Sequence, residues 1–145
     1  MITYLRRSIV LSLAALASLS VSWAAAEPME IQKSDFERFF GKWFVTSFEI
    51  APIAAISVEQ AAAMVGKAAY FEPDVVKFGS QDCPEPRYQG APPLSGNASI
   101  DIIIDCPGGQ IVPNLSLNRE NGQLFALLDG AAYRLGREPP KKYPQ

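Results

Sequence analysis

From Lys67 onward the sequence alternates short apolar or β-branched segments with turn-forming residues, and this pattern limits the possible folds more than any other feature. Segments of about four to eight such residues are typical of β-strands. Asn121-Gly122 and Asp129-Gly130 are strong signals for tight hairpins, so the last strands are predicted to run antiparallel. The predicted strands in this part of the chain are 67–71, 75–78, 87–89, 100–105, 115–119, 124–128 and 131–135.

A further strand is predicted over 43–50, which is β-branched and aromatic throughout. Two short helices are predicted to begin at capping boxes, one at 34–37 and the other at 57–60. The first helix is expected to end before Gly41 and the second to continue to Gly66. These elements give seven or eight strands with one or two short helices.

Many short antiparallel strands in one small domain predict a mainly β fold, and we expect a small up-and-down β-barrel. A barrel is favoured over a sandwich because closure removes exposed strand edges. The Pro-rich stretch 80–97 is predicted to be irregular apart from the short edge strand at 87–89. We expect the domain to span 27–137 and a flexible polar tail to follow over 138–145.

The N-terminal segment has the organisation of a secretory signal peptide. Arg6 and Arg7 precede an apolar run over 9–21, and small residues for cleavage follow at 24–26. We expect residues 1–26 to be removed and the remaining chain to be soluble and periplasmic or secreted. An uncleaved N-terminal anchor is the alternative.

Composition excludes several classes of function. Without Arg6 and Arg7, 11 of the 13 Lys and Arg remain against 15 Asp and Glu, and this acidity argues against nucleic acid or an anionic membrane as partner. The sequence has no histidine, which excludes Ser-His-Asp catalysis, Cys-His catalysis and His-ligated zinc. We therefore expect no enzymatic activity, no cofactor and no metal.

Cys83 and Cys106 are the two cysteines. In an oxidising compartment such a pair is predicted to form a disulfide, which would stabilise the fold by about 3 kcal/mol. Two free buried thiols are the alternative. A redox site is disfavoured because the C-x-x-C spacing that lowers the pKa of a thiol is missing.

The run Phe40-Gly41-Lys42-Trp43 lies at the start of the first predicted strand, behind a short helix. It resembles the G-x-W motif that opens lipocalin-type barrels. The resemblance implies that Trp43 lies at the closed end, with Arg134 or Arg137 from the last strand packed across it in a cation–π contact. The overall plan is also similar to that of small bacterial periplasmic inhibitors of lysozymes and secreted proteases.

Four aromatic residues are candidates for either the core or a ligand pocket. Trp43 is expected to plug one end of the barrel. A packed barrel would use Tyr70, Phe78 and Tyr133 as core, whereas a hollow barrel would line its pocket with them.

Two further groups of residues are candidate sites. Ile53 and Ile56 lie in the apolar, Pro-containing connection 51–56, which either tucks onto the barrel or presents these side chains to a partner. Asp101 and Asp105 share one face of a strand, where paired carboxylates can act as acid and base. A solvated outer face is the simpler interpretation of that pair.

The sequence thus favours an exported binding domain, and we expect an inhibitor or modulator of a cell-envelope hydrolase of the lysozyme or protease type. The alternative is a lipocalin-like carrier of a small apolar ligand, which requires an interior cavity of about 300 Å³ or more. A carboxylate-dependent enzyme is the weakest of the three hypotheses.

Overall fold

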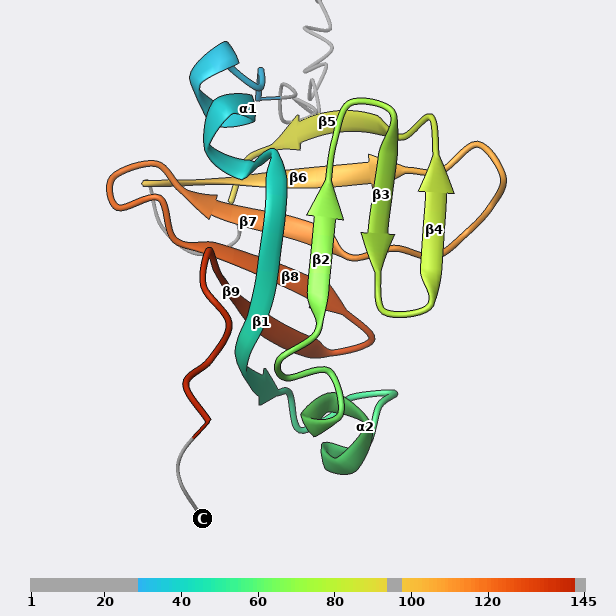
Figure 1. Cartoon of the computed structure of the whole chain (residues 1–145). Coiled ribbons are helices and arrows are strands. Elements are labelled where there is room, and N and C mark those ends of the chain that lie inside the picture. Colours follow the sequence, from blue (N-terminus) through green and yellow to red (C-terminus); the bar gives the residue numbers. More distant parts are fainter. Residues whose placement is uncertain (1–28, 94–97, 143–145) are drawn as a thin grey trace, which may run out of the picture.

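The computed structural model describes residues 29–93 and 98–142. The predicted signal peptide 1–26 and the end of the predicted tail lie outside these ranges. Within them, nine antiparallel strands form one curled sheet with a short helix at each end (Figure 1). The predicted mainly β, antiparallel, barrel-like fold class is confirmed.

The strands are β1 (Gly41–Ile50), β2 (Ala68–Phe71), β3 (Val75–Phe78), β4 (Gln81–Pro84), β5 (Arg87–Ala91), β6 (Ser99–Asp105), β7 (Asn114–Asn118), β8 (Leu124–Leu128) and β9 (Ala131–Gly136). Their order in the sheet is β4-β3-β2-β1-β9-β8-β7-β6-β5. Consecutive strands are therefore paired everywhere except between β4 and β5, and the first strand pairs with the last.

The sheet folds over on itself through β1. The first residues of β1 pair with β2, whereas the rest pair with β9, and the register shifts between Val45 and Ser47. A bulge of this kind bends a strand and increases its twist. As a result, β2, β3 and β4 cross in front of the layer formed by β5–β8, and the core lies between the two layers (Figure 1).

One strand was not predicted. Residues 81–84 form β4, although the prolines in this region predicted irregular structure. The prediction is wrong here because β4 is an edge strand that pairs only with β3, and Pro84 stands at its end. A proline at the end of an edge strand removes no hydrogen bond that the sheet requires.

The two helices differ from their predictions in detail. Helix α1 (Lys33–Phe39) has Gln32 as its N-cap, so the predicted capping box at 34–37 is wrong. The side chain that closes the first turn is Asp35, which accepts a hydrogen bond from the Gln32 N–H at 2.9 Å. Helix α2 (Val58–Ala62) does begin at the predicted capping box, but turns replace its last residues, because Gly66 donates back to the Val45 carbonyl of β1 at 2.8 Å.

Candidate functional site

The interior of the domain is filled by side chains. Phe78 and Tyr133 are 2% and 1% exposed, and their ring centroids lie 5.5 Å apart. Ile100 and Ile102 of β6 and Trp43 of β1 are also buried. Three of the four candidate aromatic residues therefore belong to the core.

Tyr70 is the exception. Its neighbours in β2, Ala69 and Phe71, are fully buried, so the alternation of the strand places Tyr70 on the outer face. There it lies beside Lys77 of β3, and the Lys42 ammonium is 5.7 Å from the ring centroid. The prediction that Tyr70 faces the interior is wrong, because two adjacent aromatic residues in a strand cannot point to the same side.

The α1 end is closed by Trp43 and Arg137. The Arg137 guanidinium lies 3.7 Å from the centroid of the Trp43 ring, and the indole N–H donates to the Phe39 carbonyl at 2.8 Å. The same guanidinium donates to the carbonyls of Arg38, Phe40 and Lys42. Of the two arginines predicted for this contact, Arg137 makes it, whereas Arg134 bonds Gln123 instead.

Asp35 and Arg119 form a second link at this end, which the sequence did not predict. Asp35 is 2% exposed, and its two carboxylate oxygens accept from Arg119 at 2.7 and 3.0 Å. Burial raises the pKa of Asp35, but hydrogen bonds from Arg119 and the Gln32 N–H outweigh it and hold the pKa below its usual value. The pair fastens α1 to the connection between β7 and β8.

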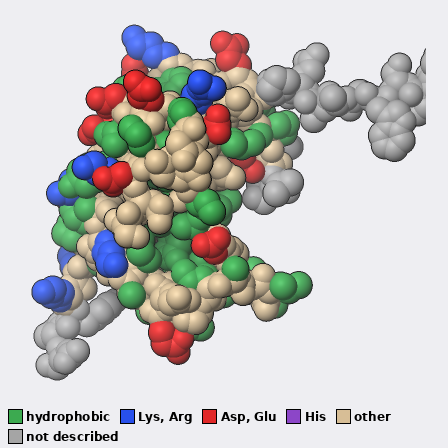
Figure 2. All heavy atoms as spheres, turned by 90° about the vertical axis from the view of Figure 1, so that its right-hand side faces the viewer, with side chains coloured by type: hydrophobic (Ala, Val, Ile, Leu, Met, Phe, Trp, Pro, Cys, Tyr) green, Lys and Arg blue, Asp and Glu red, His purple; other side chains and the backbone are tan. Residues whose placement is uncertain are grey.

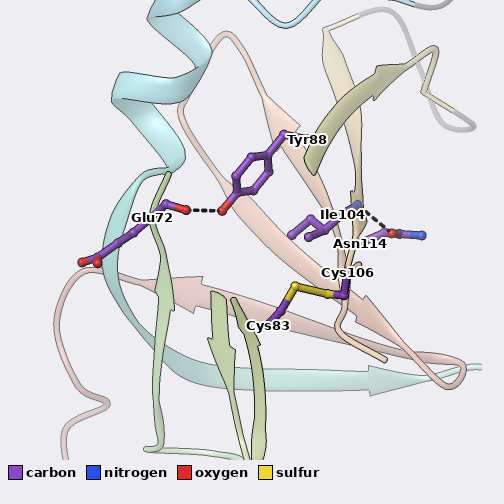
Figure 3. Close-up of a disulfide and its surroundings, with 6 residues drawn as sticks. All are labelled: Glu72, Cys83, Tyr88, Ile104, Cys106 and Asn114. Atoms are coloured by element: carbon purple, nitrogen blue, oxygen red, sulfur yellow. Dashed lines mark hydrogen bonds between the residues drawn. A yellow bond between two sulfur atoms is a disulfide. The ribbon is translucent and has the colours of Figure 1, made fainter. Parts of the chain in front are cut away.

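The open side of the sheet, between β4 and β5, is closed by side chains. Cys83 of β4 and Cys106, which follows β6, form the predicted disulfide, with a Cα–Cα distance of 5.6 Å (Figure 3). Tyr88 of β5 reaches across to donate to the Glu72 carbonyl at 2.6 Å. Burial, with the nearby Glu72 and Asp74 carboxylates, raises the pKa of Tyr88. These contacts hold the two layers together where no backbone pairing does.

The loop 51–56 lies at the opposite end, beside α2. Ile53 is 95% exposed, whereas Ile56 packs against the core. The backbone N–H groups of Ala51 and Ala55 donate to the carbonyls of Gly130 and Asp129 at 2.9 and 3.0 Å. The loop thus tucks onto the barrel through one isoleucine and presents the other to solvent.

Gly130 allows this loop to approach the turn between β8 and β9. Its φ is +83°, and a Cβ atom at this position would lie 2.8 Å from the Ala54 Cα. Only glycine meets both conditions without displacing the loop. The presented Ile53 is therefore held between two backbone hydrogen bonds and one close backbone contact.

A surface hollow of about 490 Å³ lies beside the loop, at the ends of β1, β8 and β9. It is lined by Glu49, Ile50, Ala51, Leu127, Leu128, Asp129, Gly130, Ala131 and Ala132. Figure 2 shows the lower lobe, which holds α2, set off from the main body by an indentation with hydrophobic side chains. The sequence did not single out Glu49 or Asp129, although Asp129 belongs to the Asp-Gly turn.

The candidate carboxylate pair lies on the surface of the domain. Asp101 and Asp105 lie on the outer face of β6, and the alternating Ile100, Ile102 and Ile104 point into the core. Within 29–93 and 98–142, no cluster of His, Cys, Asp and Glu could hold a metal ion. The solvated outer face is the interpretation that the strand supports.

No helix within the described part of the chain is long and apolar enough to cross a membrane. The chain matches no model of a known protein family, no curated protein and no solved structure.

Proposed function

We propose that the chain is an exported binding protein that inhibits or modulates a cell-envelope hydrolase of the lysozyme or protease type. In this proposal the loop 51–56 is the contact segment, and Ile53 fills an apolar pocket of the partner. The observation that carries the proposal is the 95% exposure of Ile53 on a loop that is fixed on both sides.

A large apolar side chain in water is a source of binding energy. Burying an isoleucine side chain contributes about 1.5–3 kcal/mol relative to leaving it exposed. Because Ala51 and Ala55 are bonded to the β8–β9 turn and Ile56 packs against the core, little further ordering of the loop is needed on binding. A preorganised loop loses less entropy than a flexible one, so more of the burial energy appears as affinity.

Export is part of the same proposal. The segment 1–26 reads as a signal peptide, and the disulfide Cys83–Cys106 is typical of proteins in an oxidising compartment. We place the protein in the periplasm or outside the cell. The proposal assigns no catalytic residue and no cofactor.

The test compares Ile53→Ala with Ile111→Ala in the full chain, expressed with its own leader. Ile111 is a suitable control because it is also largely exposed, at 69%, but lies outside the loop 51–56 and does not line the hollow beside it. The protein is assayed for inhibition of a muramidase and of serine, cysteine and metalloproteases. We expect Ile53→Ala to weaken inhibition about tenfold to a hundredfold, since three carbons are lost at about 0.8 kcal/mol each.

Ile111→Ala should leave inhibition unchanged. Two results would overturn the proposal. One is that the full chain inhibits none of these enzymes and recovers no hydrolase from a periplasmic extract. The other is that both isoleucine variants weaken inhibition equally, which would remove the loop from the contact surface.

A further inference from the structure

The hollow beside the loop combines apolar walls with carboxylates at its edge. Leu127, 38% exposed, and Ala132 supply apolar surface on the outer face beside Glu49, whereas Ile50 and Leu128 pack against the core. Glu49 at the end of β1 and Asp129 in the β8–β9 turn are exposed acidic residues. Its volume of about 490 Å³ falls in the range of about 300–1,000 Å³ that binding pockets occupy.

The charge around this hollow has one sign. Among its lining residues, Glu49 and Asp129 are the charged ones, and none is Lys or Arg. The negative charge of Asp129 also affects a nearby residue. Burial raises the pKa of Tyr133, and the Asp129 charge raises it further. An occupant of this hollow therefore contacts both apolar walls and a negatively charged rim.

We infer that the hollow receives a lysine or arginine side chain of the partner whose apolar pocket takes Ile53. The methylene stem of such a side chain packs on apolar surface while its charged head remains at the edge. Here the stem would contact Leu127 and Ala132, which share the outer face of the sheet with Glu49, and the head would reach the carboxylates of Glu49 and Asp129. This inference rests on the proposed function, because it assigns the second half of the same interface.

Charge complementarity decides between the possible occupants. An apolar side chain would fill the walls but would draw two carboxylates into a less hydrated rim without a partner, which is unfavourable. A second copy of this chain, docked symmetrically at this surface, would bring the Glu49 and Asp129 carboxylates of both copies together, and like charges repel. A cationic side chain satisfies both parts of the hollow.

The test uses the full chain labelled with ¹⁵N and two small probes of similar length. N-acetyl-lysine amide carries the charge, whereas N-acetyl-norleucine amide has the stem alone. We expect the lysine probe to shift the amide resonances of 127–132 and to bind about three- to tenfold more tightly than the norleucine probe. Added salt should reduce this preference.

Charge-neutral variants locate the effect. Glu49→Gln with Asp129→Asn should remove the preference for lysine, and asparagine tolerates the left-handed backbone at 129, where φ is 53°. Glu59→Gln is the matched control, because Glu59 is exposed on α2 but does not line the hollow. It should leave both probes unaffected.

Three results would overturn the inference: equal binding of the two probes, lysine shifts spread evenly over other acidic residues, or a preference that survives the double variant. These results are independent of the proposed function. Failure of that function would appear as absent hydrolase inhibition, whatever the lysine probe does, whereas failure of the inference leaves the effect of Ile53→Ala on inhibition intact.

Discussion

The two ends of the domain are built in opposite ways. At the α1 end, the large and charged side chains make contacts within the molecule. Trp43 is covered by Arg137, and the buried Asp35 is paired with Arg119. At the α2 end, the connecting loop is held through its backbone, by two hydrogen bonds to the β8–β9 turn. One of its two isoleucines, Ile53, is left in water.

Under the proposed function, this difference separates stability from recognition. A side chain that is already packed has little burial energy left to give a partner, whereas an exposed one on a fixed backbone retains nearly all of it. The α1 end should therefore respond to substitution through unfolding, and the α2 end through binding. Three substitution pairs test that division, each with a member that should behave differently.

Trp43→Ala should have the largest effect on folding. Trp43 is 5% exposed, donates to the Phe39 carbonyl and carries the Arg137 guanidinium on its ring, so we expect the free energy of unfolding to fall by about 3–5 kcal/mol. Ile53→Ala removes an exposed side chain and should change it by less than about 0.5 kcal/mol. Urea denaturation followed by far-UV circular dichroism measures both values. Similar losses for the two variants would contradict the division between the ends.

Asp35→Asn should have an intermediate effect that depends on pH. Since hydrogen bonds lower the pKa of Asp35 in the folded protein, its carboxylate stabilises the fold above the unfolded pKa of about 4. This contribution is lost as the pH falls through the folded pKa. Arg119 keeps 29% of its side-chain surface exposed, so water screens the pair and we expect about 1–2 kcal/mol at neutral pH.

The measurement is the free energy of unfolding of wild type and Asp35→Asn between pH 7 and pH 2.5. The difference between the two proteins should shrink at the acidic end. Glu37→Gln is the control on the same helix, because the Glu37–Lys33 pair is exposed and should contribute little at any pH. A difference for Asp35→Asn that stays constant with pH would show that the carboxylate charge is not what fastens α1.

The sequence predicted the positions of the strands far better than it predicted how the sheet closes toward a barrel. Hairpin turns such as Asn121-Gly122 and alternation such as that of Ile100 and Ile102 are local, so they are readable from neighbouring residues. The gap between β4 and β5 is not local. It depends on where the sheet stops curling, and only the predicted Cys83–Cys106 disulfide marked the place.

The same contrast between local and non-local features applies to the candidate site. The apolar connection containing Ile53 and Ile56 was visible, but which isoleucine packs and which is presented depends on contacts across the chain with Asp129 and Gly130. Tyr70 was misplaced because it and Phe71 are adjacent in one strand, so only one of the two can face the interior, and Phe71 takes the inward position. The acidic rim consists of Glu49 in β1 and Asp129 in the β8–β9 turn. These residues are far apart in the sequence, so no local pattern predicted that they line the same hollow.

The smallest expected difference, and the sharpest comparison, comes from two glycines in the connections that join β7, β8 and β9. Gly122 and Gly130 have φ values of +71° and +83°, and they follow Asn121 and Asp129 in hairpins at the α1 and α2 ends. Alanine at either position costs about 1–2 kcal/mol for its left-handed backbone. A Cβ at Gly122 meets nothing within 4 Å, whereas at Gly130 it meets the Ala54 Cα at 2.8 Å. Both positions thus carry a left-handed backbone, and of the two only Gly130 has the loop in contact.

Gly130→Ala must therefore push the loop 51–56 away, while Gly122→Ala leaves its surroundings in place. We expect the extra loss of stability at Gly130 to be about 1 kcal/mol, because the loop has few other contacts to break. The clearer readout is amide hydrogen exchange at Ala51 and Ala55, whose N–H groups bond the turn. Faster exchange there in Gly130→Ala alone would show that Ile53 is held in position by the turn, and unchanged exchange would show that the loop is fixed by Ile56 instead.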